Sequence, residues 1–142
     1  MPAAEIRRYV DSKIWSSYYK FCVDRNPWGK AVSSFHWVNR HLDSKVSFGE
    51  FISSNALDTI KGFDQYSQDS RILMDRVYRY DELADAMEHI AVRLDLGDIF
   101  ELPRAKSGVR KIEGYRSMYF LEQREVVAKH FRREIEYFGF EY

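Results

Sequence analysis

The sequence has few of the residues that define specialised classes of protein. Its 142 residues include one cysteine, three prolines and seven glycines, and 22 lysines and arginines balance 22 aspartates and glutamates. The lone Cys22 excludes an internal disulfide, and zero net charge gives no overall field that would steer the chain onto nucleic acid or an anionic membrane. No apolar run approaches the roughly 18 residues that a membrane span needs. We therefore expect no nucleic-acid partner and no transmembrane segment.

The apolar content is sufficient for one hydrophobic core. Hydrophobic residues make up 45% of the chain and aromatic residues 16%, and the length suits a single domain over 1–142. The first residues lack the apolar centre of a signal peptide, which together with the lone cysteine predicts a cytoplasmic protein. Histidine and cysteine do not recur at metal-ligand spacing, so we expect no metal site.

Hydrophobic periodicity and capping residues predict helices that alternate with two strands. The helices are expected at about 3–10, 27–42, 48–54, 81–94 and 117–137, and the strands at about 18–23 and 73–78. Segment 57–70 is expected to be an irregular loop, and the aromatic tail 138–142 is expected to pack on the body. This order of elements indicates an α/β fold in which a few parallel strands are flanked by helices.

Specific residues are expected to cap and bury the predicted helices. The cap residues are Asn26, Ser47 and Asp81. The side chains expected to face inward are Trp28, Val32, Phe35 and Leu42 in the second helix, Leu83, Met87, Ile90 and Leu94 in the fourth, and Phe120, Val127, Phe131 and Ile135 in the last.

The strongest motif runs from Tyr19 to Ser33. A predicted buried strand ends at Arg25, and Asn26 and Pro27 begin a helix at once. Lys30 and Ser33 are three residues apart and therefore share one face of that helix. Free N–H groups at a helix N-terminus and an arginine side chain both suit phosphate oxygens. The motif thus predicts an anion-binding corner.

This motif resembles the sulfotransferase family, in which an aromatic-Lys-Phe strand is followed by Arg-Asn-Pro-aromatic, a basic residue and a serine. The resemblance implies that Arg25 and Ser33 bind the 3'-phosphate of 3'-phosphoadenosine 5'-phosphosulfate (PAPS). It continues at 79–83, 102–110, 115–116 and 134–142. The activity implied is transfer of a sulfuryl group from PAPS to a hydroxyl or amine of a carbohydrate or other small acceptor, with no metal.

A second basic segment lies within the resemblance. Glycine permits close backbone approach to a ligand, and the side chains around it supply hydrogen-bond donors. Related sulfotransferases carry a basic loop that closes over the nucleotide. The resemblance assigns that role to Lys106, Ser107, Gly108 and Arg110.

The sequence before Arg25 contains no glycine-rich loop with lysine and serine or threonine, although related enzymes use one to hold the 5'-phosphosulfate. The resemblance therefore implies a single sulfotransferase-like domain over 1–142 that corresponds to the C-terminal part of the family domain, with a partial P-loop-like fold. No catalytic residue is assigned. We expect little or no sulfuryl transfer from this chain alone.

Several alternatives remain open. The chain is either part of such an enzyme or an inactive remnant that binds a nucleotide or a protein partner, by oligomerising or by pairing with an N-terminal half-domain through exposed sheet edges. Asp24 either pairs with Arg25 or repels phosphate. Cys22 is interpreted as a small core residue, and His36 is the one histidine close enough to Ser33 to test. Segment 43–70 is assigned to the acceptor side by elimination.

Overall fold

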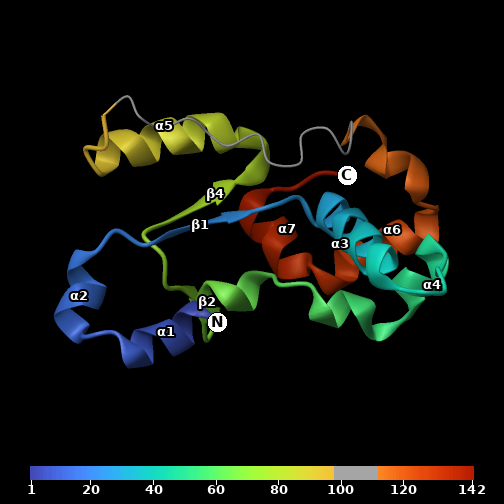
Figure 1. The fold of residues 1–142 in the computed structure, drawn as a ribbon, viewed down its shortest axis with the longest axis horizontal. Helices are drawn as coiled ribbons and strands as arrows, with labels where there is room; N and C mark the ends of the chain where they lie inside the picture. Colours follow the sequence, from blue (N-terminus) through green and yellow to red (C-terminus); the bar gives the residue numbers. More distant parts are fainter. Residues whose placement is uncertain (98–111) are drawn as a thin grey trace.

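The computed structural model describes residues 1–97 and 112–142, in which helices surround a small parallel sheet (Figure 1). Strand β1 (Phe21–Asp24) pairs with β4 (Arg76–Arg79), in a register that places Phe21 opposite Arg76 and Asp24 opposite Arg79. A short antiparallel ribbon joins β2 (Ser67–Gln68) to β3 (Arg71–Ile72). The fold is therefore mixed α/β, as the order of predicted elements indicates.

The described residues also form seven α-helices and four 3₁₀ turns, joined by irregular segments. The helices are α1 (Ala3–Tyr9), α2 (Ser12–Ser17), α3 (Pro27–His41), α4 (Phe48–Ser53), α5 (Leu83–Arg93), α6 (Leu121–His130) and α7 (Arg132–Phe138). The 3₁₀ turns are Asn55–Thr59, Phe63–Gln65, Tyr80–Glu82 and Ile112–Met118.

The main hydrophobic core lies where α3, α4 and α6 pack together. Its buried side chains include Trp28, Ala31, Val32, Phe35, Phe48, Phe51, Ile52, Leu57, Val127, Phe131 and Phe140. Burying each large apolar side chain of this kind contributes about 1.5–3 kcal/mol. Phe140 belongs to the tail, so the prediction that the tail packs on the body is confirmed.

A smaller core lies on the other side of the sheet, where α5 covers β4 (Figure 1). It consists of Tyr78, Ala86 and Ile90, with Met87 packed against them. The sheet therefore lies between α5 and the main helical body. This arrangement fixes the carboxyl end of β1 against the start of α3.

The predicted caps of α3 and α4 are confirmed. The Asn26 side chain accepts a hydrogen bond from the Trp28 backbone N–H. Ser47 and Glu50 form a reciprocal capping box, in which each side chain bonds the other residue's backbone N–H. The predicted Asp81 cap is wrong, because its carboxylate instead binds the Arg79 guanidinium at 2.8 Å, and α5 begins at Leu83 without a side-chain cap.

The predicted helix over 117–137 is broken at Phe131, which ends α6 and precedes α7. Phe131 leaves the helical conformation at φ −101° and ψ 29° while its ring stays buried in the main core. Phe120 lies before the first turn of α6 and is 74% exposed, so its predicted inward position is wrong. Leu42 and Leu94 are also exposed, because α3 and α5 end one residue before them.

Strand β1 begins later than predicted and is more open than predicted. Phe21 and Val23, which share one face of the strand, are 38% and 39% exposed. Strand β4 pairs with one edge of β1, and no described strand pairs with the other. Helix α2 and the β2–β3 ribbon were not predicted. Segment 57–70 contains 3₁₀ turns, and it buries Leu57, Phe63 and Tyr66.

Candidate functional site

A pocket of about 370 Å³ lies beside α3, close to the point where β1 ends. It is lined by Arg25, Lys30, Ser33, Ser34, Trp37, Ile60 and Lys61. Arg25 follows β1 directly, four of the others come from α3, and Ile60 and Lys61 come from the segment after α4. The two residues that the motif assigns to phosphate, Arg25 and Ser33, therefore line one pocket.

The Arg25 side chain has no acidic partner within the described residues. Its guanidinium lies over the Tyr80 ring, 5.0 Å from the centroid. Gly29 lies next to it, and a β-carbon at Gly29 would make an ordinary contact of 3.4 Å with the Arg25 Nε. An arginine held by an aromatic ring keeps its planar donors available for phosphate oxygens.

The Asp24 carboxylate is engaged away from the Arg25 side chain. It forms an ion pair with Lys30 at 2.5 Å and accepts hydrogen bonds from the Tyr66 hydroxyl and the Arg25 backbone N–H, both at 2.7 Å. Asp24 is 6% exposed, so it needs such partners. The open question about Asp24 is thus answered, because Lys30 compensates its charge and Arg25 remains unpaired by it.

Burial and the nearby Asp24 carboxylate also suppress ionisation of two neighbours. Burial first, and then Asp24, raises the pKa of Tyr66, so this phenol stays protonated and donates its hydrogen bond. The same two causes raise the pKa of Cys22 to about 12. We therefore expect the Cys22 thiol to stay protonated and to react slowly at neutral pH. Cys22 is only partly buried and belongs to neither of the described core clusters, so its interpretation as a core residue is not confirmed.

The pocket runs along the side of α3 and not onto its N-terminus. Lys30, Ser33 and Trp37 share the face of α3 that lines it, and Ser33 is exposed there. The N-terminal N–H of Trp28 is already bonded to Asn26. Arginine, lysine and hydroxyl groups, more than the helix terminus, therefore make the pocket suitable for an anion.

Three segments that carry the family resemblance meet at this corner. Tyr80 packs on Arg25, the Arg79 guanidinium lies 5.0 Å from the Phe140 ring centroid, and the Asn26 side-chain amide donates to the Glu141 carbonyl at 2.9 Å. These residues are far apart in the sequence. The fold therefore brings residues 25–26, 79–80 and 140–141 into one neighbourhood.

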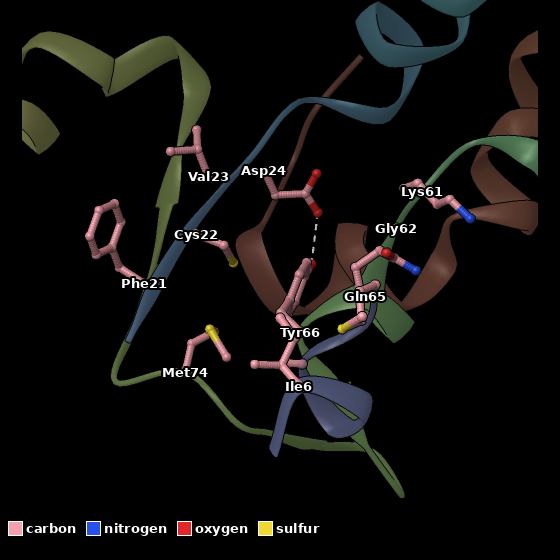
Figure 2. Close-up of a pocket in the computed structure, with 12 residues that line it drawn as sticks. Ile6, Phe21, Cys22, Val23, Asp24, Lys61, Gly62, Gln65, Tyr66 and Met74 are labelled. Atoms are coloured by element: carbon pink, nitrogen blue, oxygen red, sulfur yellow. Dashed lines mark hydrogen bonds between the residues drawn. The ribbon is translucent and has the colours of Figure 1, made fainter. Parts of the chain in front are cut away.

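A second cavity of about 310 Å³ follows the edge of β1 that faces away from β4 (Figure 2). It is lined by Met1, Ala3, Ile6, Phe21, Cys22, Val23, Asp24, Lys61, Gly62, Gln65, Tyr66 and Met74. Most of these side chains are apolar, and we call this cavity the β1-edge groove. Lys61 is the residue that it shares with the pocket beside α3.

Comparison with known proteins identifies a relative in an archaeon. Over 100 residues, which cover 68% of this chain and 83% of the relative, the sequence is 32% identical to an uncharacterized protein of Archaeoglobus fulgidus. The chain belongs to the family of this archaeal protein. No protein-family model and no solved structure matches it. Membership of the archaeal family places the chain among relatives without assigning a chemistry to them.

The other predicted site residues have different outcomes. Lys106, Ser107, Gly108 and Arg110 lie outside the described residues. His36 packs its ring against Phe35 at 4.8 Å and is not among the pocket-lining residues. From the predicted acceptor segment 43–70, Ile60 and Lys61 line the pocket beside α3. Lys61 was missed, because no motif surrounds it and only folding brings it beside Arg25.

Within residues 1–97 and 112–142, no three histidine, cysteine or acidic side chains are grouped so that they could hold a metal ion. None of the helices in this same part of the chain is long and apolar enough to cross a membrane.

Proposed function

We propose that this chain binds the 3'-phosphate of PAPS, or of its product adenosine 3',5'-bisphosphate (PAP), as part of a sulfotransferase. The observation that carries the proposal is that the Arg25 guanidinium, unpaired by any described carboxylate, lines the same pocket as the Ser33 hydroxyl. An arginine fork and a hydroxyl donor are the groups that bind a terminal phosphate. The resemblance of residues 19–33 to the family supplies the identity of the nucleotide.

The chemistry that such a site serves is in-line transfer. The bond between the sulfur and the bridging oxygen of PAPS breaks, the electron pair leaves with PAP, and the acceptor oxygen or nitrogen bonds to sulfur after losing its proton to a base. In this scheme Arg25 and Ser33 hold the nucleotide end of the donor and thereby orient the reacting bond. The proposed role of Lys106, Ser107, Gly108 and Arg110 is to close over the nucleotide.

Calorimetric titration with PAP tests the site. We expect Arg25→Ala to weaken PAP binding at least tenfold and Ser33→Ala to weaken it less, because the arginine contributes charge and two donors. Arg40→Ala, which removes an exposed arginine at the far end of the same helix, is the matched control and should bind like the wild type. Equal PAP affinity in the wild type and Arg25→Ala would refute the assignment.

Catalysis by the chain alone is a separate question. Sulfuryl transfer also needs stabilisation of charge at the bridging oxygen and on the transferred group, and no described residue is assigned to that task. We expect PAP binding without appreciable transfer from labelled PAPS to sugar or amine acceptors. Sustained transfer by the 142 residues alone would show that the catalytic groups lie within them.

The second candidate is a non-catalytic interaction module, and the open edge of β1 favours it. The edge lies along the apolar β1-edge groove, where its unpaired backbone groups suit one more extended strand from a second copy of the chain. Sedimentation over a range of concentrations tests this candidate. It predicts self-association that Val23→Lys abolishes, whereas a monomer at all concentrations contradicts it.

A further inference from the structure

Lys61 is the residue of the anion pocket that no sequence motif indicates. It lies in the short connection between the 3₁₀ turns at Asn55–Thr59 and Phe63–Gln65, and it lines the pocket with Arg25 and Ser33. Figure 2 shows its amino group turned away from the Asp24–Tyr66 hydrogen bond. Within the described residues Lys61 has no ion pair.

The positive charges around the pocket are not equally available to a ligand. Three cationic side chains line it, and none of its lining residues is acidic. Lys30 is compensated by the buried Asp24 carboxylate. Arg25 and Lys61 have no described acidic partner. Two uncompensated positive charges therefore face a pocket that also offers the Ser33 and Ser34 hydroxyls.

Two uncompensated positive charges match a doubly charged anion better than a singly charged one. A terminal phosphate (a phosphomonoester) carries close to two negative charges at neutral pH, because its second pKa is about 6. A phosphodiester or a sulfate ester carries one. The second cation contributes more to binding of the dianion than of the monoanion, since Coulombic attraction is proportional to the charge on the ligand.

We propose that Lys61 pairs with Arg25 across the pocket to select a terminal phosphate dianion over a singly charged ester. Arg25 provides the planar fork, and Lys61 provides a point charge from a separate segment of the chain. The inference rests on the proposed function, because it takes the 3'-phosphate of PAP as the ligand. It adds a specificity-determining residue that the motif of residues 19–33 does not contain.

The test compares two ligands on matched variants. PAP carries the 3'-phosphate as a monoester, and an analogue with a methyl group on that phosphate carries it as a singly charged diester. We expect the wild type to prefer PAP at least tenfold. Lys61→Gln should bind PAP at least tenfold more weakly while its affinity for the methyl diester changes less than threefold, and Lys61→Arg should keep the wild-type preference.

Controls separate this inference from the function on which it rests. Lys13→Gln, which removes an exposed lysine on α2, should bind both ligands like the wild type, and thermal melts should show that each variant is folded. If PAP binding depends on Arg25 but is unchanged in Lys61→Gln, the role of Lys61 is refuted while the proposed function stands. Absence of PAP binding by the folded wild type overturns both the inference and the proposed function.

Discussion

The Asp24 carboxylate lies 2.5 Å from the Lys30 amino group, and this buried ion pair separates the functions of two adjacent residues. Asp24 is bound by Lys30 and Tyr66, whereas the Arg25 side chain next to it lies on Tyr80. An acidic residue directly before Arg25, the proposed phosphate-binding residue, is therefore compatible with anion binding. The buried Asp24 charge, however, depends on Lys30 for its compensation.

That dependence can be measured with Asp24→Asn. The change leaves the Lys30 charge buried without its partner, and removing one member of a buried pair costs about 3–5 kcal/mol. We expect a loss of about that size in the free energy of unfolding from urea denaturation. Asp64→Asn is the control, because the Asp64 carboxylate that pairs with Arg133 is 83% exposed, and its loss should cost at most about 1 kcal/mol. Similar losses in both variants would contradict a buried pair at Asp24.

The Cys22 thiol should react slowly in the folded protein. Burial first, and then Asp24, raises its pKa to about 12, whereas an exposed thiol has a pKa of about 8.5. At pH 8 the folded protein should thus be alkylated by iodoacetamide roughly a thousandfold more slowly than the protein in urea.

The same pKa difference sets a pH dependence of stability. The unfolded chain loses the thiol proton near pH 8.5, and the folded chain keeps it to about pH 12, so this group stabilises the fold below that window and its contribution is lost as pH rises through it. In the iodoacetamide experiment, a reaction rate of the folded protein equal to that in urea would show that Cys22 is accessible.

Ile90 should be the critical contact between α5 and the sheet. It is 1% exposed and packs with Tyr78 and Ala86. Ile90→Ala should lower the free energy of unfolding by about 2–5 kcal/mol through lost burial and the cavity left behind. Val92 lies on the same helix and is 78% exposed, so Val92→Ala should change stability by less than about 0.5 kcal/mol. Equal effects would mean that α5 does not pack on β4 as described.

Gly62 should not tolerate a side chain. A β-carbon there would collide with the Glu134 carboxylate, which is buried and accepts the Phe63 backbone N–H at 2.7 Å. We expect Gly62→Ala to destabilise the fold by about 1–3 kcal/mol in thermal or urea unfolding. Gly114→Ala is the control, because its β-carbon would meet the Ser117 hydroxyl at an ordinary 3.6 Å. A neutral Gly62→Ala variant would show that Glu134 moves aside without cost.

Local signals account for the parts of the fold that the sequence predicts. Asn26 and Ser47 act on backbone groups two or three residues away, so α3 and α4 begin where their caps indicate. Phe120, Leu42 and Leu94 were wrongly predicted to face inward, because the helical spacing of apolar residues in the sequence extends beyond the residue where each helix starts or ends. The spacing also predicts the buried position of Phe131 correctly, but it contains no signal for the break in the helix at this residue.

The candidate site divides in the same way. Arg25 and Ser33 lie in one short motif, and the structure places both in the predicted neighbourhood, although their phosphate ligand stays a prediction. The sequence leaves open whether Asp24 pairs with Arg25 or repels phosphate, and it does not indicate the ion pair with Lys30, because that pair depends on side-chain directions in the fold. The place of Lys61 in the site could not be predicted from the sequence, because only the tertiary structure brings it into the pocket that Arg25 lines.

The parallel pairing of β1 with β4 also has a kinetic consequence. Lys20 and Asp75, which join the two strands at their beginning, are 55 residues apart in the sequence, and α3 and α4 lie in the intervening chain. Closing so long a loop costs conformational entropy before any strand contact is gained. The contacts between α3 and α6 close a still longer loop, since Trp28 and Arg124, which share a hydrogen bond, are 96 residues apart. Both the sheet that carries Arg25 and the main core therefore depend on long-range contacts, and we expect the chain to fold slowly for its size.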